Sequence, residues 1–131
     1  MIDKTKKQYQ EFGEFLRGYV FDLNNLAEEG WSVLVEGKRD KVALRKLGYV
    51  GNLVTTYTLT TNGYSALEGK KKVVILTDLD REGAVLASKY IKRLTHDGFR
   101  TSLKERLRLK NNSHGVFLHV ENLARFAPED S

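Results

Sequence analysis

The sequence predicts an α/β fold, a compact Rossmann-like arrangement in which a mostly parallel central sheet of about four strands is flanked by helices. The segments at residues 32–35 and 72–77 contain continuous runs of Val, Leu and Ile, at 33–35 and 73–76, which suits strands that are covered on both faces. Segments with helical spacing of apolar residues alternate with these runs, as in βαβ units. Right-handed crossovers then bring successive strand ends to one edge of the sheet.

Length and composition point to one soluble domain. The chain has 131 residues, 40% of them apolar and 30% charged, which is ordinary for a globular protein. It contains no apolar run of the roughly 18 residues that a membrane helix needs, and its N-terminus lacks the apolar core of a signal peptide. We therefore expect a cytoplasmic protein with no membrane contact. The absence of cysteine excludes disulfides, thiolate zinc sites and a cysteine nucleophile.

The first predicted element is an amphipathic helix over residues 9–26 that ends near Gly30. Its apolar residues form one stripe: Tyr9, Phe12, Leu16, Tyr19, Leu23 and Leu26. We expect this stripe to pack on the sheet as an N-terminal extension, residues 1–30, of a domain that spans residues 31–127. The alternative is a dimerisation surface, which leaves a homodimer open.

The next elements alternate between strand and helix. A strand at residues 32–35 is followed by a helix that Asp40 caps and that runs to about Leu47. Residues 52–57 are rich in Val, Thr and Tyr and predict a second strand. The polar stretch at residues 58–69 predicts a loop with a short helix around residues 65–67.

The strand at residues 72–77 leads into a helix over residues 82–96, which stops at Asp97 and Gly98. The pattern is weaker beyond Gly98, where residues 103–109 fit either a basic helix or an exposed strand. The remaining predicted elements are a strand at 99–103, a loop at 111–113, a strand at 116–120 and a short helix at 121–126.

Acidic residues directly follow the two apolar runs. Glu36 ends the first run, and Asp78 and Asp80 end the second. Side chains at i and i+2 of a strand share a face, so the two aspartates can point to one place. Two such carboxylates repel each other unless a cation or a shared proton lies between them, and Mg²⁺ prefers oxygen ligands. The alternative is that Asp80 only caps the next helix and Asp78 is a solvated loop residue.

Residues beside these acids have predicted supporting roles. Gly37 allows a sharp turn after Glu36, and Gly83 allows the backbone to approach closely. Three basic side chains adjoin the acids and could hold a phosphate, or could simply compensate negative charge: Lys38, Arg39 and Arg81.

The net charge of +5 favours a polyanionic partner. One basic run is a candidate nucleic-acid contact, with a solvated surface as the alternative: Lys104, Arg106, Arg108 and Lys110. The three histidines, His96, His114 and His119, share no ligand spacing, which favours surface or packing roles. No dinucleotide or P-loop motif is present.

The segments VEGKRD, which contains Glu36, and TDLDREG, which contains Asp78 and Asp80, resemble the Toprim domain over roughly residues 31–126. This resemblance implies a Toprim fold with Glu36 as general acid or base, or as a further metal ligand, and with Asp78 and Asp80 as ligands of Mg²⁺, which Mn²⁺ can replace. The DREG stretch is most similar to type IA topoisomerases and implies Glu82 as a third acid. Those enzymes carry another glutamate where this chain has Ala84.

The resemblance implies a small metal-dependent nuclease or RNA-processing enzyme. Its similarity to stand-alone ribosomal-RNA maturases favours RNA slightly over DNA. The chain is too short for a whole topoisomerase or primase. The alternative is a non-catalytic nucleic-acid-binding module, or a subunit of an RNA-processing, ribosome-associated, topoisomerase or primase assembly.

Overall fold

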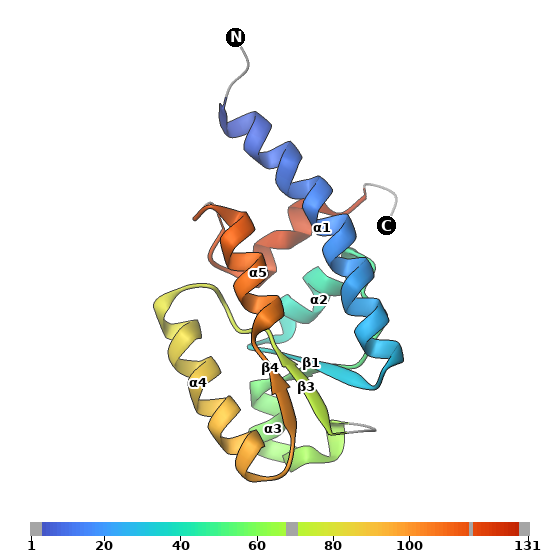
Figure 1. Cartoon of the computed structure of the whole chain (residues 1–131), viewed down its shortest axis with the longest axis vertical. Coiled ribbons are helices and arrows are strands. Elements are labelled where there is room, and N and C mark those ends of the chain that lie inside the picture. Colours follow the sequence, from blue (N-terminus) through green and yellow to red (C-terminus); the bar gives the residue numbers. More distant parts are fainter. Residues whose placement is uncertain (1–3, 68–70, 116, 129–131) are drawn as a thin grey trace.

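A four-stranded, all-parallel sheet forms the centre of the protein, which confirms the predicted fold class (Figure 1). The computed structural model describes residues 4–67, 71–115 and 117–128. The strands lie in the order β2-β1-β3-β4. Their bounds are β1 Trp31–Val35, β2 Leu53–Thr55, β3 Lys72–Ile75 and β4 Arg100–Ser102.

The direction of winding reverses at the middle of the sheet. From β1 the chain passes through helix α2 (Lys38–Lys46) to β2, whereas from β3 it passes through α4 (Arg81–His96) to β4 on the other side. Strands β1 and β3 are direct neighbours. In open α/β sheets such a switch point leaves a crevice at the carboxyl ends of the strands, where ligands bind.

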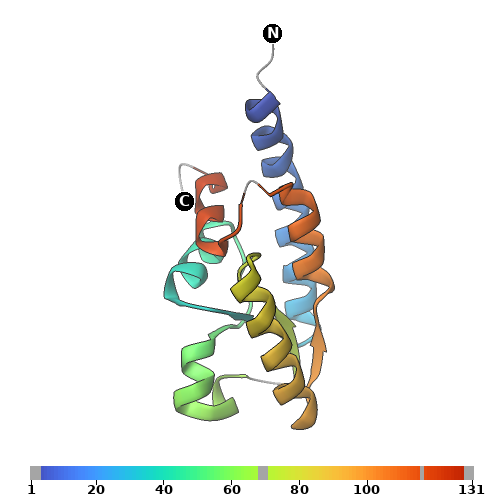
Figure 2. The ribbon, with the colours of Figure 1, turned by 90° about the vertical axis from the view of Figure 1, so that its left-hand side faces the viewer.

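Helices cover both faces of the sheet, because successive strand residues point to opposite sides. Val33 and Val35 belong to one buried cluster with residues of α1 (Lys4–Glu28) and α5 (Lys104–Ser113), whereas Leu34 belongs to a second cluster with residues of α3 (Thr56–Asn62) and α4. Figure 2 shows α1 and α5 side by side, with α3 on the opposite side of the molecule.

The predicted N-terminal helix is α1, and its apolar stripe packs into the core. Phe12, Leu16, Tyr19 and Leu23 are buried. The ring of Phe12 stacks on Phe117 at a centroid distance of 5.5 Å, which joins the first helix to the C-terminal segment. No helix of the described residues is long and apolar enough to cross a membrane.

The predicted second strand is too long. Strand β2 ends at Thr55, and α3 begins at once because the side chain of Thr55 accepts a hydrogen bond from the N–H of Thr58 at 3.1 Å. Tyr57 therefore lies on a helix rather than a strand. The 3₁₀ helix η1 (Gly63–Ala66) follows, where we expected mostly loop.

Asp40 does not occupy the N-cap of α2 as predicted. Gly37 is the N-cap, and Asp40 lies three residues later. Its carboxylate accepts a hydrogen bond from the N–H of Gly37 at 2.9 Å. Asp40 therefore stabilises the first turn of the helix from position N3, as in a capping box.

The C-terminal third departs most from the predictions. Helix α5 begins at Lys104, after the N-cap Leu103, which bears out the helical alternative for residues 103–109, but it also takes in the predicted loop at 111–113. Residues 117–119 form no strand; they lead into the 3₁₀ helix η2 (Val120–Phe126), and residue 116 is outside the described range. Phe117 and Val120 are buried in the cluster that contains α1, so this apolar pattern reflects packing against a helix rather than strand pairing.

Candidate functional site

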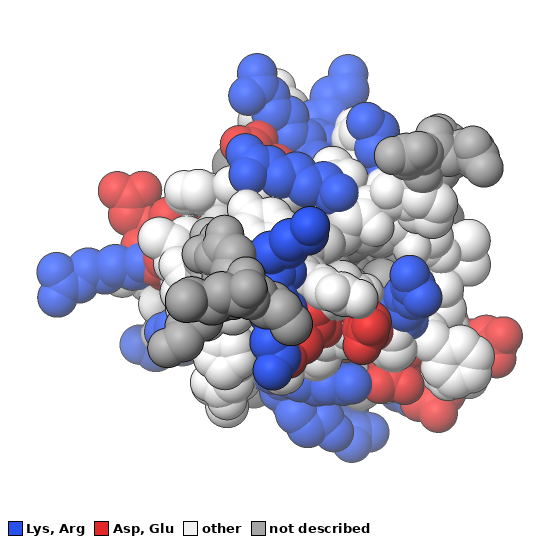
Figure 3. Space-filling model, turned by 90° about the horizontal axis from the view of Figure 1, so that it is seen from above, with Lys and Arg blue, Asp and Glu red and all other residues white. Residues whose placement is uncertain are grey.

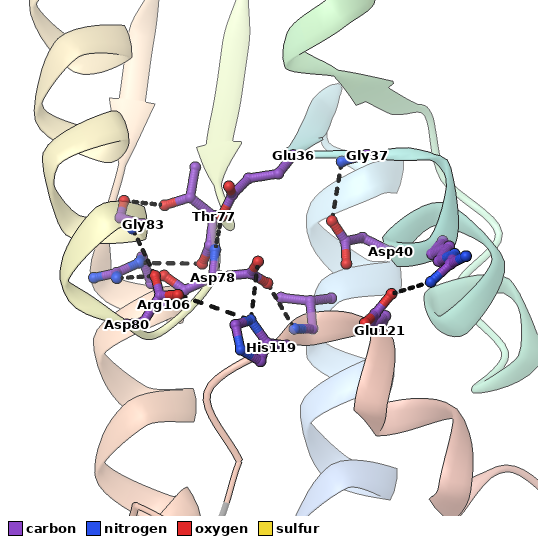
Figure 4. Close-up of polar contacts among 12 residues, drawn as sticks. Glu36, Gly37, Asp40, Thr77, Asp78, Asp80, Gly83, Arg106, His119 and Glu121 are labelled. Carbon is purple, nitrogen blue, oxygen red and sulfur yellow. Dashed lines mark hydrogen bonds and ion pairs between the residues drawn. The ribbon is translucent and has the colours of Figure 1, made fainter.

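Glu36 and Asp78 meet at the switch point, as the edge argument predicts. Glu36 directly follows β1, and Asp78 follows β3 after a short extended segment. A carboxylate oxygen of Glu36, Oε2, accepts a hydrogen bond from the N–H of Asp78 at 2.6 Å (Figure 4). This contact joins the carboxyl ends of the two central strands.

Asp78 is held from several elements at once. Its carbonyl oxygen accepts a hydrogen bond from Nη2 of Arg106 on α5 at 2.6 Å. Its carboxylate Oδ1 accepts one from the N–H of Val120 at the start of η2, at 2.8 Å. The next residue, Leu79, donates its N–H to the carbonyl of Leu118 at 2.6 Å. The C-terminal segment therefore fixes the direction of the Asp78 side chain.

Gly83 provides the close backbone approach. A Cβ atom at this position would lie 1.8 Å from the carbonyl oxygen of Asp78, so only glycine fits without moving the loop. The carbonyl oxygen of Gly83 also accepts a hydrogen bond from the buried hydroxyl of Thr77 at 2.7 Å. Helix α4 is thus seated directly against the loop that carries both aspartates.

Asp80 has two contacts of different kinds. Its Oδ1 accepts a hydrogen bond from the N–H of Gly83 at 2.7 Å, so it caps α4. Its Oδ2 lies 3.8 Å from Nδ1 of His119. Asp80 therefore caps the helix with one oxygen and faces the acidic site with the other.

His119 is the site residue that the sequence analysis missed. Its Nδ1 lies 3.4 Å from Oδ2 of Asp78 as well as 3.8 Å from Asp80, so one ring nitrogen faces both carboxylates (Figure 4). The hydrogen bond to Asp78 is the main cause that raises the pKa of His119, and the charges of both aspartates add to it. No spacing signal marks His119, because it reaches the site from an irregular segment distant in sequence.

Burial changes the electrostatics of the neighbouring groups. It raises the pKa of Glu36, and the charge of Asp78 raises it further. Burial also raises the pKa of Asp40, which is only 6% exposed and has Asp78 and Glu121 nearby. Arg106 is 8% exposed, and burial lowers its pKa while the surrounding acids oppose that change. Arg106 is thus a buried positive charge beside the acids.

The donor set suits a hard cation with few protein ligands. Asp78 and Asp80 both direct an oxygen at Nδ1 of His119, so the imidazole lies between the two carboxylates that would hold a cation. Within the described ranges, however, no three His, Asp or Glu side chains are grouped so that they could hold a metal. Mg²⁺ often takes only one or two carboxylates and keeps its waters. Glu82 is exposed on the first turn of α4, and its part in the site stays a prediction.

The basic residues beside the acids are distributed around the site. Lys38 and Arg39 are exposed at the start of α2, and Nη1 of Arg39 lies 3.9 Å from a carboxylate oxygen of Glu121. Arg81 is exposed at the first position of α4. These side chains can reach solvent near the acidic site.

The basic run on α5 does not form one exposed stripe. Arg106 turns inward to the carbonyls of Thr77 and Asp78, and Arg108 pairs with Asp22 of α1 at 2.6 Å. Lys104 and Lys110 are both exposed, and Lys104 also lines a cavity against α1. Figure 3 shows basic side chains spread over this end of the molecule with acidic ones between them. Arg106 is therefore placed to hold the site loop rather than a nucleic acid.

Comparison with known proteins finds relatives over most of the chain. A UPF0292 protein of Methanosarcina acetivorans is 30% identical over 124 residues, which are 93% of this chain and 83% of that protein. A UPF0292 protein of Pyrococcus abyssi is 35% identical over 102 residues, 77% of either chain. A solved structure from Aquifex aeolicus matches with a TM-score of 0.65 and 32% identity, over 80% of this chain and 94% of that one. No family model matches.

Proposed function

The chain belongs to the UPF0292 family. From the geometry of its acidic site, we propose that it is a small, metal-dependent enzyme that hydrolyses nucleic-acid phosphodiesters. The observation that carries the proposal is the meeting of Glu36 and Asp78 across the carboxyl ends of β1 and β3, at the switch point where α/β proteins bind ligands. The resemblance of both segments to the Toprim domain supports the same chemistry. We also propose that the enzyme acts in the cytoplasm.

The proposed roles follow from the contacts of each residue. Asp78 and Asp80 would hold Mg²⁺ or Mn²⁺, which supplies charge stabilisation at the phosphate. Glu36 gives a proton to the leaving oxygen as water attacks the phosphate and the P–O bond breaks, and the burial that raises its pKa favours the protonated carboxyl. Lys38, Arg39 and Arg81 orient the phosphate from outside. Buried Arg106 keeps the aspartate loop in place.

Cleavage of end-labelled structured RNA, single-stranded DNA and supercoiled plasmid tests the proposal. With Mg²⁺ or Mn²⁺ the wild type should give products, with RNA cut best, and EDTA should abolish them. Glu36→Gln should reduce the rate by about 10²- to 10⁴-fold, the usual contribution of a positioned proton-transfer group. Asp78→Asn should also be inactive, whereas Glu14→Gln, on the exposed side of α1, should cut normally. Absence of cleavage at concentrations where the protein binds these substrates would refute the proposal.

A second candidate is a non-catalytic nucleic-acid-binding subunit of an RNA- or DNA-processing assembly. It is favoured by one observation: Oδ1 of Asp78 already accepts the N–H of Val120 and Oδ2 faces His119, so a metal would compete with these contacts for the same carboxylate. In this case Glu36→Gln would bind nucleic acid as the wild type does, and neither protein would cut it.

A further inference from the structure

A cavity of about 390 Å³ lies beside the acidic site, between the first turn of α2 and the start of α3. The residues that line it are Gly37, Lys38, Lys41, Thr55, Tyr57 and Thr58. The sequence motifs account only for Gly37 and Lys38 in this lining, because Tyr57 reaches the cavity through the helix that replaces the end of the predicted strand.

One wall of this cavity is an exposed aromatic ring. Tyr57 is 74% exposed, while Leu59 on the same short helix is 1% exposed and packs into the core. A single exposed aromatic residue needs no special explanation. Tyr57 differs because it borders a cavity together with cationic side chains, which gives it a flat apolar face beside positive charge.

The cavity carries an uncompensated positive charge. Lys38 and Lys41 line it and no acidic residue does. Among the described residues neither lysine takes part in an ion pair, whereas the adjacent Arg39 faces Glu121. An anionic occupant would therefore gain two charge contacts without breaking an existing pair.

The cavity adjoins the proposed reaction site through the backbone. Gly37 and Lys38 directly follow Glu36, and the hydroxyl of Thr56 donates a hydrogen bond to the carbonyl oxygen of Glu36 at 3.0 Å. A ligand held against Tyr57 would thus extend past Glu36 if it were part of a longer chain.

We propose that this cavity is a nucleotide subsite, in which Tyr57 stacks on an unpaired base and Lys38 and Lys41 hold the adjoining phosphate. The inference rests on the proposed function, since it places the substrate strand beside Glu36. Stacking on an aromatic ring tolerates any base, and a base paired in a duplex is not free to stack. The enzyme should therefore select single-stranded segments of nucleic acid.

Fluorescence anisotropy with labelled single-stranded RNA, single-stranded DNA and RNA duplex tests this subsite in EDTA, where no cleavage occurs. Tyr57→Ala should weaken single-strand binding about tenfold, and Tyr57→Phe should restore it because the ring is retained. Duplex binding should not change. A Lys38→Ala/Lys41→Ala double variant should lower the slope of log affinity against log salt by about 1.4, as expected for two phosphate contacts on a single strand.

Matched controls and competitors separate the sources of binding. Phe21→Ala removes a comparably exposed aromatic ring from α1, 65% against 74% for Tyr57, and Lys92→Ala removes an exposed lysine from α4; both should bind as the wild type does. Competition by adenosine monophosphate shows whether the cavity accepts a free nucleotide or needs a strand. Wild-type affinity for single strands in Tyr57→Ala, or an equal loss in Phe21→Ala, would overturn the subsite.

A simple substrate keeps this inference distinct from the proposed function. Hydrolysis of bis(4-nitrophenyl) phosphate requires the acidic site and no nucleobase, so Glu36→Gln should lose it while the Phe21→Ala control retains it. Strand binding that depends on Tyr57 without hydrolysis would refute the enzyme and leave the subsite standing. Hydrolysis without Tyr57-dependent binding would refute the subsite alone.

Discussion

At the scale of single residues, Asp78 is the most constrained group in the site. Its N–H, carbonyl and carboxylate are bonded to Glu36 after β1, to α5 and to η2 respectively, and the backbone of Gly83 leaves no room for a Cβ beside its carbonyl oxygen. Such support fixes the orientation of the Asp78 carboxylate before any ligand binds. We therefore expect small substitutions beside Asp78 to reduce both stability and activity.

Gly83→Ala should be damaging because its Cβ would overlap the Asp78 carbonyl oxygen. We expect a loss of about 1–3 kcal/mol or more in the free energy of unfolding, with loss of activity. Gly18→Ala is the matched control, since nothing lies within 4 Å of its added Cβ on α1. It should stabilise the helix by about 0.5–1 kcal/mol. Equal stability of both variants in urea unfolding would contradict the close approach.

Tyr49 gives a pH-dependent prediction away from the site. Its hydroxyl is buried and has no hydrogen-bond partner among the described residues, and burial raises its pKa from 10.0 to about 12. Because the folded state favours the neutral hydroxyl, ionisation of Tyr49 does not affect the free energy of unfolding below pH 10. As the pH rises from 10 towards 12, the unfolded state ionises first and the protein loses stability.

Tyr49→Phe should therefore raise the free energy of unfolding by about 1 kcal/mol at neutral pH, because it removes an unsatisfied buried hydroxyl. It should also lessen the loss of stability between pH 10 and 12. Thermal unfolding across this range measures both effects. A less stable variant at neutral pH would indicate that the hydroxyl has a bonding partner.

At the scale of elements, α5 connects the N-terminal helix with the acidic site. On one side Arg108 pairs with Asp22 and lies over the rings of Phe15 and Tyr19, and on the other Arg106 bonds to the aspartate loop. The basic run that suggested a nucleic-acid contact is thus divided between two structural roles. Alternating Arg and Leu in this segment identified neither its helical form nor which arginine is buried.

Arg106→Met should cost about 3 kcal/mol of stability and weaken Mg²⁺ binding, because two buried carbonyls lose a donor and the loop loses its anchor. Arg108→Met should cost about 1 kcal/mol or less, since its ion pair is half exposed. Urea unfolding and calorimetric titration with Mg²⁺ compare the two. A stable Arg106→Met protein that fails only to bind nucleic acid would return Arg106 to the contact role predicted from sequence.

At the scale of the whole molecule, the doubly wound sheet explains why the site forms. Strands β1 and β3 lie side by side although about 40 residues separate Glu36 from Asp78. The helix after β1 leads to β2 on one side of this pair, and the helix after β3 leads to β4 on the other. The C-terminal segment then covers the Asp78 carboxylate with contacts from Val120 and His119. Cation binding should therefore be linked to global stability.

Excess Mg²⁺ should raise the melting temperature of the wild type. At a hundredfold excess over Kd, the free energy of unfolding should increase by about 2.7 kcal/mol. Asp80→Asn should abolish this shift. Glu82→Gln should retain most of the shift, because the Glu82 side chain is exposed on the first turn of α4. An equal loss in Glu82→Gln, measured by calorimetry, would establish the third acid that the DREG motif implies.

The sequence by itself determined the parallel α/β class, the N-terminal helix and the edge on which Glu36, Asp78 and Asp80 lie. These features depend on local periodicity and on the fixed handedness of crossovers, which neighbouring residues encode. It misjudged the end of β2 at Tyr57, the capping position of Asp40 and the segment before Val120, where tertiary contacts override local propensity.

Only the tertiary structure decided that His119 faces both aspartates, that Arg106 is buried and that Tyr57 borders a cationic cavity. Each of these depends on where a side chain meets residues far away in the chain. The physical reason is that burial and charge pairing are properties of the packed molecule, and a single segment does not specify which distant group will neutralise or cover it.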